Sequence, residues 1–209
     1  MAGWMMWGRA LAAAAMLALP ASPVRAVVVL FSDFETVTAP DFRHQGYATL
    51  VHADGWTGGA AGLEVQTNNV AGRAYSGRNL VELDTARNSA MWVELPKGRY
   101  TISYWYSPRP GVAAASNGIT LSSGGRLLDS VSGDGGGDTL WQQRSIGFTS
   151  AGGPLTFAAA GRSDSLGGYL DDITITMAAV PELATWTMLI IGFGLVGVAA
   201  RRRPRLVAS

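Results

Sequence analysis

The chain has 209 residues, no cysteine, and 16 lysine and arginine residues against 15 acidic ones, for a formal net charge of +1. The lack of cysteine excludes a disulfide scaffold, a cysteine-ligated zinc site and a thiol nucleophile. Two histidines argue against a multi-histidine metal centre, and the near-neutral charge gives no reason to expect nucleic acid. A hydrophobic fraction of 48% is high for a chain with 27 glycines, so the position of the apolar residues matters first.

Apolar residues are concentrated at both ends, beginning with the first 26 residues. Arg9 precedes an unbroken apolar run at 10–19, and the small-residue sequence "PASPVRA" follows it. This order predicts a secretory signal peptide over 1–26, removed by signal peptidase after Ala26. The alternative is a membrane anchor, but ten helical residues rise only about 15 Å, half of the roughly 30 Å hydrocarbon core.

Residues 27–180 are the size of one domain and contain no helical pattern of useful length. They contain short runs rich in β-branched and aromatic residues and bounded by Gly, Pro, Asn or Asp, a pattern typical of strands. The runs are 27–31, 62–67, 79–84, 89–95, 99–107, 118–122, 126–132, 141–148, 154–159 and 169–177. We therefore predict an all-β fold, an antiparallel β-sandwich with jelly-roll connections.

Four carboxylates form a candidate metal site. Asp33 and Glu35 end the first predicted strand, and Asp171 and Asp172 begin the last. First and last strands often lie side by side in such sandwiches, and calcium prefers several carboxylate oxygens. The alternatives are that an arginine such as Arg99 pairs with Asp171, that hydrogen bonds satisfy it, or that these residues are exposed.

Aromatic residues provide candidates for sugar binding, which needs a ring against the apolar side of a pyranose. On the strand 99–107, Trp105 faces away from Tyr104 and Tyr106. We place most aromatic rings of the domain in the interior of the sandwich. Trp56, in "DGWTGG", and Trp141, beside the glycine-rich run 133–140, are the better surface candidates. No nucleophile elbow, zincin motif or phosphate loop is present in the sequence, so we do not expect an enzyme.

The C-terminal end carries a second apolar segment. Residues 184–200 are uncharged, with Trp186 near one edge and an arginine cluster at 201–205 at the other. This predicts a transmembrane helix with the main body outside the inner membrane. Small residues at Gly192, Gly194 and Gly197 would let another helix approach closely.

This tail closely resembles the PEP-CTERM sorting signal of Gram-negative bacteria, over residues 181–209. Leu183 and Thr187 depart from the usual pattern, and a plain C-terminal anchor is the alternative. The resemblance implies recognition by an exosortase, cleavage near Pro181-Glu182, and association with exopolysaccharide and biofilm systems. The matching residues are Pro181, Glu182, Trp186, Met188, Gly192, Phe193, Gly194, Gly197, Arg201, Arg202 and Arg203.

The central domain resembles galactose-binding-like, carbohydrate-binding jelly rolls. The landmarks are Phe34-Glu35, Gly55-Trp56, and the runs "LEVQ" at 63–66, "LVELD" at 80–84, "GRYTISYWY" at 98–106, "LTF" at 155–157 and "LDDITIT" at 170–176. By analogy, the resemblance favours Glu35 and Asp172 as ligands of a structural calcium ion, the one cofactor we expect.

Together these features predict an exported protein, anchored through its C-terminal helix before processing and then at the cell surface or outside the cell. Its sandwich would interact with exopolysaccharide. The alternatives are a structural or adhesive surface protein without a sugar ligand, or a glycoside-acting enzyme. Residues 27–180 keep ten basic and 14 acidic residues, a net charge of −4, which suits an extracellular matrix but not binding of anionic polymers by bulk charge.

Overall fold

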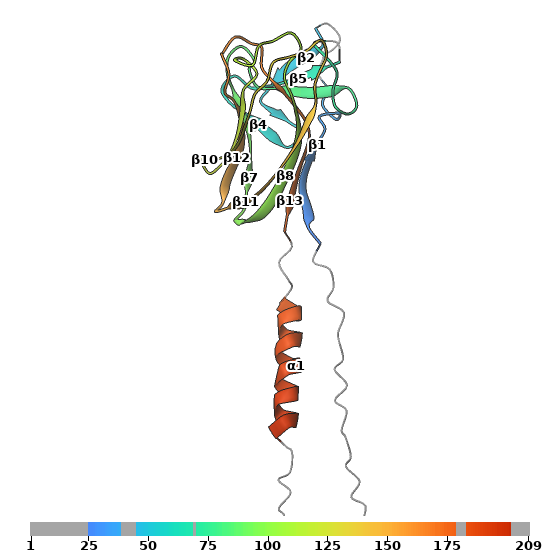
Figure 1. Cartoon of the computed structure of the whole chain (residues 1–209), viewed down its shortest axis with the longest axis vertical. Helices are drawn as coiled ribbons and strands as arrows, with labels where there is room; N and C mark the ends of the chain where they lie inside the picture. The colour runs from blue at the N-terminus through green and yellow to red at the C-terminus, as the bar shows by residue number, and fades with distance from the viewer. Residues whose placement is uncertain (1–24, 39–44, 69, 179–182, 202–209) are drawn as a thin grey trace, which may run out of the picture.

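A computed structural model describes residues 25–38, 45–68, 70–178 and 183–201 (Figure 1). These residues form strands and one helix. In chain order they are β1 (Val27–Ser32), β2 (Tyr47–Leu50), β3 (His52–Ala53), β4 (Trp56–Gly58), β5 (Leu63–Thr67), β6 (Asn79–Glu82), β7 (Ala90–Leu95), β8 (Gly98–Ser107), β9 (Ile119–Ser123), β10 (Arg126–Val131), β11 (Gln142–Ser150), β12 (Gly153–Ala159), β13 (Tyr169–Met177) and α1 (Leu183–Arg201).

The strands form two sheets packed face to face, as Figure 1 shows. The seven-stranded sheet has the order β11-β8-β13-β6-β5-β2, with β1 also paired to β13, and the six-stranded sheet has the order β10-β9-β12-β7-β4-β3. Every strand pair described is antiparallel. The predicted antiparallel β-sandwich is confirmed, and it is consistent with a jelly roll.

Side-chain alternation explains why these segments form half-buried strands. In β8, Tyr100, Ile102, Tyr104 and Tyr106 are all buried, whereas the residues between them point away from the core. Each fully buried apolar side chain contributes about 1.5–3 kcal/mol. A one-residue slip would exchange this buried set for the polar one, so the core determines the register of β8.

All ten predicted strands are present with small shifts at their ends, but β2, β3 and β4 were not predicted. These three strands have only two to four residues and lie among glycines, so they carry no alternation that a sequence pattern could reveal. Pairing with β5 and β7 makes them strands.

A charged clamp joins the two sheets along one side of the sandwich. Asp129 on β10 accepts hydrogen bonds from Arg144 on β11, at 2.7 and 2.9 Å, and from the Tyr104 hydroxyl at 2.8 Å. Burial alone would raise the pKa of Asp129, but the hydrogen bonds from Arg144 and Tyr104 outweigh it and lower the pKa. The clamp therefore holds an ionised carboxylate where one sheet meets the other.

The helix α1 occupies the position of the predicted C-terminal helix, and its apolar side chains from Leu189 to Val198 are exposed. However, no helix within residues 25–38, 45–68, 70–178 and 183–201 is long and apolar enough to cross a membrane, so the prediction of a transmembrane helix at 184–200 is not supported. Gly192, Gly194 and Gly197 have open space beside them. Residues 1–24 of the predicted signal peptide 1–26 lie outside the described residues, as do Pro181, Glu182, Arg202 and Arg203.

Candidate functional site

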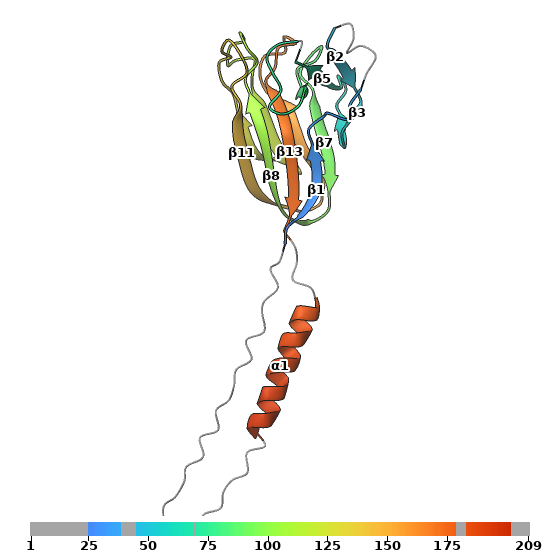
Figure 2. The same ribbon diagram turned by 90° about the vertical axis from the view of Figure 1, so that its right-hand side faces the viewer.

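The surface of the seven-stranded sheet that points away from the core is a broad face formed by β11, β8, β13 and β1. Figure 2 shows these strands side by side. The residues of β8 that alternate with its buried tyrosines point outward, and register places partners from the adjacent strands beside them. We call this surface the outer face. It comprises Arg99, Thr101, Ser103 and Trp105 on β8, Gln143, Ser145, Gly147 and Thr149 on β11, Thr174 and Thr176 on β13, and Phe31 on β1.

Small side chains make the floor of the outer face. Ser145 lies opposite Ser103, which lies opposite Thr174, and Gly147 lies opposite Thr101. A Cβ placed on Gly147 would meet no atom within 4 Å, so the surface above it is open. The floor is therefore flat and carries hydroxyl groups that can donate and accept hydrogen bonds.

Three aromatic rings, which we call the aromatic cluster, stand at one end of the outer face. Tyr75 stacks on Trp105 with ring centroids 3.8 Å apart and planes at 15°, and Trp141 meets Tyr75 edge-on at 6.2 Å. The Trp141 Nε1–H donates to the Arg73 carbonyl at 2.9 Å, which fixes its ring. Tyr75 remains 42% exposed, so its ring presents an apolar surface to solvent.

Carboxylates anchor the loop that carries Tyr75, residues 70–78. Asp171 Oδ2 accepts from the Tyr75 and Ser76 amides at 2.9 and 3.2 Å, and Asp172 accepts from the Ser76 hydroxyl at 2.7 Å. Glu35 Oε1 accepts from the Arg78 and Asn79 amides at 2.7 and 2.6 Å. The loop is therefore tied to β13 and to the end of β1 rather than free.

This arrangement brings together three of the four predicted calcium ligands around one loop. Asp33 instead accepts from the Glu35 amide at 3.2 Å. In the described part of the chain, no group of three or more His, Asp or Glu side chains is placed to hold a metal ion. Asp171 and Glu35 accept backbone amide hydrogen bonds, and Asp172 accepts one from the Ser76 hydroxyl. Hydrogen bonding is the alternative given above for Asp171.

Asp171 is fully buried, and burial is the main reason that its pKa rises to about 7, against the lowering effect of amide hydrogen bonds. The alternative that Arg99 pairs with Asp171 is wrong. Register places Asp171 opposite Trp105, whereas Arg99 lies opposite Thr149, six residues away along β8.

Trp56 is not a surface platform, contrary to the prediction. It is 1% exposed, its Nε1–H donates to Ser32 Oγ at 3.0 Å, and its ring contacts Phe157. The glycines around Trp56 suggested a loop, but Gly55 adopts a positive φ of 87° that reverses the chain, and β4 then directs the indole inward.

Trp141 lies where a surface role requires it, half-buried in the aromatic cluster. The sequence reasoning missed Tyr75, because its partner Trp105 is 30 positions away and no local pattern marks the contact. Trp105 did carry a signal, since it alternates with the buried tyrosines of β8 and so had to face outward.

A second group of perturbed carboxylates lies on β5 and β6. Glu82 pairs with Glu64 across β5 and with Tyr169 across β13. It accepts hydrogen bonds from the Gln66 amide, the Gly167 amide and Arg109 Nη1, the last at 2.5 Å. Burial raises the pKa of Glu82 to about 8 despite Arg109 beside it.

The Glu82 group is structural rather than a site for a solute. Glu82 is 1% exposed, and its partners come from β5 and two loops that it holds together. The Tyr169 hydroxyl has no hydrogen-bond partner among the described residues, so this group is a costly internal network. Sequence reasoning missed it because four separate segments, β5, β6 and the loops with Arg109 and Gly167, supply its members.

No protein-family model matches the chain, and no curated protein sequence matches it. Among solved structures, the chain is similar to the CBM22-1 xylan-binding domain of Xyn10C from Paenibacillus barcinonensis, with 15% identity, a TM-score of 0.46, and 77% of this chain and 100% of that chain covered. It is also similar to the Stig cyclase Fisc from Fischerella sp. TAU, with 12% identity, a TM-score of 0.49, and 75% and 100% covered. The K2 adhesin domain of Lys-gingipain shows 16% identity, a TM-score of 0.47, and 71% and 97% covered. Because the identities and TM-scores are this low, these similarities carry no argument about ligand or activity. The resemblance of the C-terminal tail to a sorting signal stays a prediction.

Replacing Glu82 with Gln should change how stability depends on pH. Folded Glu82 has a pKa of about 8 against its usual 4.5, so the folded state binds a proton that the unfolded state has already released. The contribution of this proton to the free energy of unfolding is fully present below about pH 4.5 and is lost as pH rises through about 8. We expect the melting temperature of the unaltered protein to fall more between pH 5 and 9 than that of Glu82→Gln. Circular dichroism measures both melting temperatures, and the same dependence on pH in the two proteins would contradict this prediction.

Structural calcium at Glu35 and Asp172 stays a prediction with a direct test. A bound ion would raise the melting temperature of chelator-treated protein by several degrees when calcium is returned. Asp172→Asn should abolish that rise while keeping the fold, because asparagine tolerates the positive φ of 45° found there. A melting temperature that is the same with chelator and with calcium would contradict the prediction.

Proposed function

We propose that the outer face binds carbohydrate, with the aromatic cluster as its stacking platform. The observation that carries this is the stacked Tyr75–Trp105 pair, which stands at the end of a flat, hydroxyl-lined floor. An aromatic ring packs against the apolar side of a pyranose, and neighbouring polar groups bind its hydroxyls.

The geometry supports an extended ligand. Trp105 and Arg99 point outward from the same strand and are six residues apart, which spans about 20 Å. A flat strip of this length suits a chain of several sugar residues better than a small molecule, which is bound in a concave pocket.

The cluster is also organised before a ligand arrives. Trp105 supports Tyr75 from below, Trp141 is fixed by its bond to the Arg73 carbonyl, and Asp171 holds the backbone of the Tyr75 loop. Little ordering is then left for the binding step, which favours affinity.

Two other functions remain as alternatives. An adhesive role without sugar draws on β1, where Val27, Val28, Val29 and Phe31 are all exposed. A glycoside-acting enzyme needs two accessible carboxylates, and Asp171, beside the outer face, is fully buried under the Tyr75 loop.

Tyr75→Ala and Trp141→Ala should each weaken binding about two- to tenfold, because a lost ring contact costs about 0.5–1.5 kcal/mol. A glycan array followed by calorimetry on the purified chain measures this. Trp92→Ala is the matched control, since Trp92 is a half-exposed tryptophan on the outside of the other sheet. Trp56→Phe should leave affinity unchanged.

Three results of this experiment would count against the proposal. Absence of binding to every glycan, including the host's own exopolysaccharide, would favour the adhesive role. Equal loss in Trp92→Ala would show that the outer face is not the site. Cleavage of a glycan, lost on changing one carboxylate, would favour the enzyme.

We further propose that the chain is exported and then processed by an exosortase at its C-terminal end. The support is the order of features in the sequence: a signal-like segment, the sandwich, Pro181-Glu182, the apolar helix α1 and the arginine cluster. A surface protein of this kind would meet exopolysaccharide outside the cell.

Mass spectrometry of the cell-surface form tests the proposed processing. We expect a mature N-terminus at Val27 and a C-terminus near Pro181-Glu182. Deletion of 201–209 should leave the protein unprocessed at that end. A surface form that still extends to Ser209 would contradict exosortase processing.

A further inference from the structure

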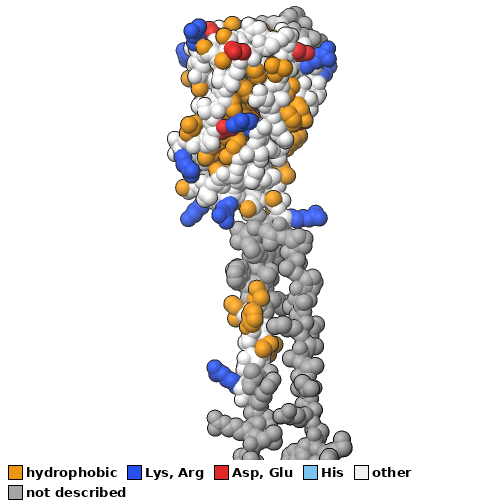
Figure 3. Space-filling model, in the orientation of Figure 1, with side chains coloured by type: hydrophobic (Ala, Val, Ile, Leu, Met, Phe, Trp, Pro, Cys, Tyr) orange, Lys and Arg blue, Asp and Glu red, His pale blue; other side chains and the backbone are white. Residues whose placement is uncertain are grey.

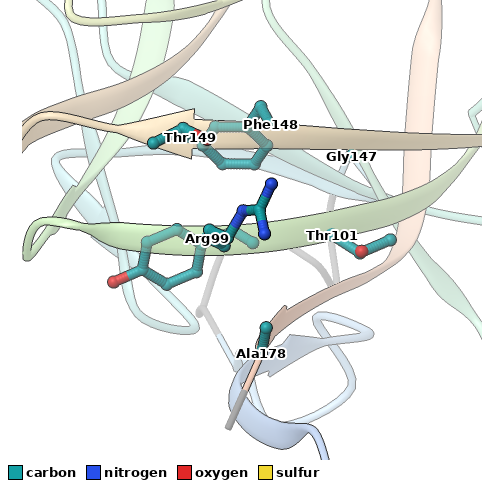
Figure 4. Close-up of a pocket in the computed structure, with 7 residues that line it drawn as sticks. Arg99, Thr101, Gly147, Phe148, Thr149 and Ala178 are labelled. Carbon is teal, nitrogen blue, oxygen red and sulfur yellow. The ribbon is translucent and has the colours of Figure 1, made fainter. Parts of the chain in front are cut away.

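A shallow depression of about 390 Å³ lies on the outer face, at the end opposite the aromatic cluster. Its lining includes Arg99 and Thr101 on β8, and Gly147 and Thr149 on β11. Figure 4 shows the Arg99 guanidinium rising between the two strands, with Thr101 and Thr149 on either side of it along the face. Because Gly147 has no side chain, nothing fills the space above it.

The charge of Arg99 is not used within the described part of the protein. Arg99 is exposed and takes part in none of the three ion pairs found there. At the same end of the sandwich, Lys97 on the turn before β8 and Arg126 at the start of β10 are likewise exposed and outside those pairs. On the face seen in Figure 3, lysine and arginine side chains lie along this end, whereas the visible acidic side chains lie further up.

We propose that the Arg99 depression binds an oxyanion, a carboxylate or sulfate, carried by the same glycan that stacks on the aromatic cluster. The planar guanidinium donates two parallel hydrogen bonds to such a group, and the hydroxyls of Thr101 and Thr149 supply further donors. The substrate class is thus an acidic glycan. This inference rests on the proposed function.

One ligand can reach both places because they share a strand face. Arg99 and Trp105 are separated by about 20 Å along β8, and the floor between them carries only Ser, Thr and Gly from three strands. The ligand is therefore a chain of several sugars that has its anionic group away from the stacked residue.

The overall charge of the domain restricts the kind of acidic glycan. Residues 27–180 carry a net charge of −4, which repels a densely charged polyanion at long range. A glycan with sparse anionic groups avoids most of this repulsion and still gains the local contact with Arg99.

The test uses pairs of oligosaccharides that differ only in charge. The probes are glucuronate-substituted xylo-oligosaccharide and oligogalacturonate, each against its carboxyl-reduced form, and a sulfated galacto-oligosaccharide against its desulfated form. In calorimetry with the full chain, we expect the charged member of at least one pair to bind at least tenfold more tightly. The pair that shows the difference identifies the anion as carboxylate or sulfate.

Arg99→Gln should remove that difference, whereas Arg126→Gln should retain it. Both changes remove one positive charge from the same end of the sandwich, so the comparison separates contact in the depression from bulk electrostatics. Both side chains are exposed, and unchanged melting temperatures would show that the variants fold.

Failure of the inference and failure of the proposed function give different results. Equal binding of charged and neutral members, lost in Tyr75→Ala but not in Arg99→Gln, would overturn the acidic-glycan inference and leave carbohydrate binding standing. Equal effects of Arg99→Gln and Arg126→Gln would overturn it as well. If no probe and no array glycan binds, both the acidic-glycan inference and the proposed carbohydrate binding are contradicted.

Discussion

The two faces of β8 are the constraint on which the rest of the structure depends. Its inward residues, from Tyr100 to Tyr106, pack in the core between the sheets, and Tyr104 also reaches the Asp129–Arg144 clamp. This burial locks the register of β8 against β11 and β13, since a one-residue slip would bury the polar set. The outward residues from Arg99 to Trp105 therefore take fixed positions. The outer face is thus a consequence of core packing.

Buried carboxylates extend this rigid scaffold into the loops. Asp171 holds the backbone of the Tyr75 loop, and Glu82 holds Arg109 and Gly167. In both cases burial raises the pKa, to about 7 for Asp171 and to about 8 for Glu82. Backbone amides and one arginine offset part of the desolvation cost. Loop position, and with it the Tyr75 ring, thereby depends on groups that never touch a ligand.

Trp56 and Tyr75 show where sequence reasoning succeeded and failed for the site. Both lie beside glycines in segments that read as loops. Pairing of β4 with β7 directs Trp56 into the core, whereas stacking on Trp105 keeps Tyr75 at the surface. Neither outcome has a local signal, because each depends on a strand more than 25 residues away. Trp105 could be assigned to the outside, since alternation within one strand is a local property.

The sequence by itself determined that this chain is an all-β sandwich and where ten of its strands lie, because alternation and turn residues act over a few positions. Only the tertiary structure decided which aromatic rings meet, which carboxylates are buried, and which residues of β11 and β13 lie beside Arg99 and Trp105 on the outer face. Those facts depend on strand order and on cross-strand register, which bring residues far apart in the chain into contact. A one-dimensional pattern does not encode that pairing, because many strand orders satisfy the same alternation.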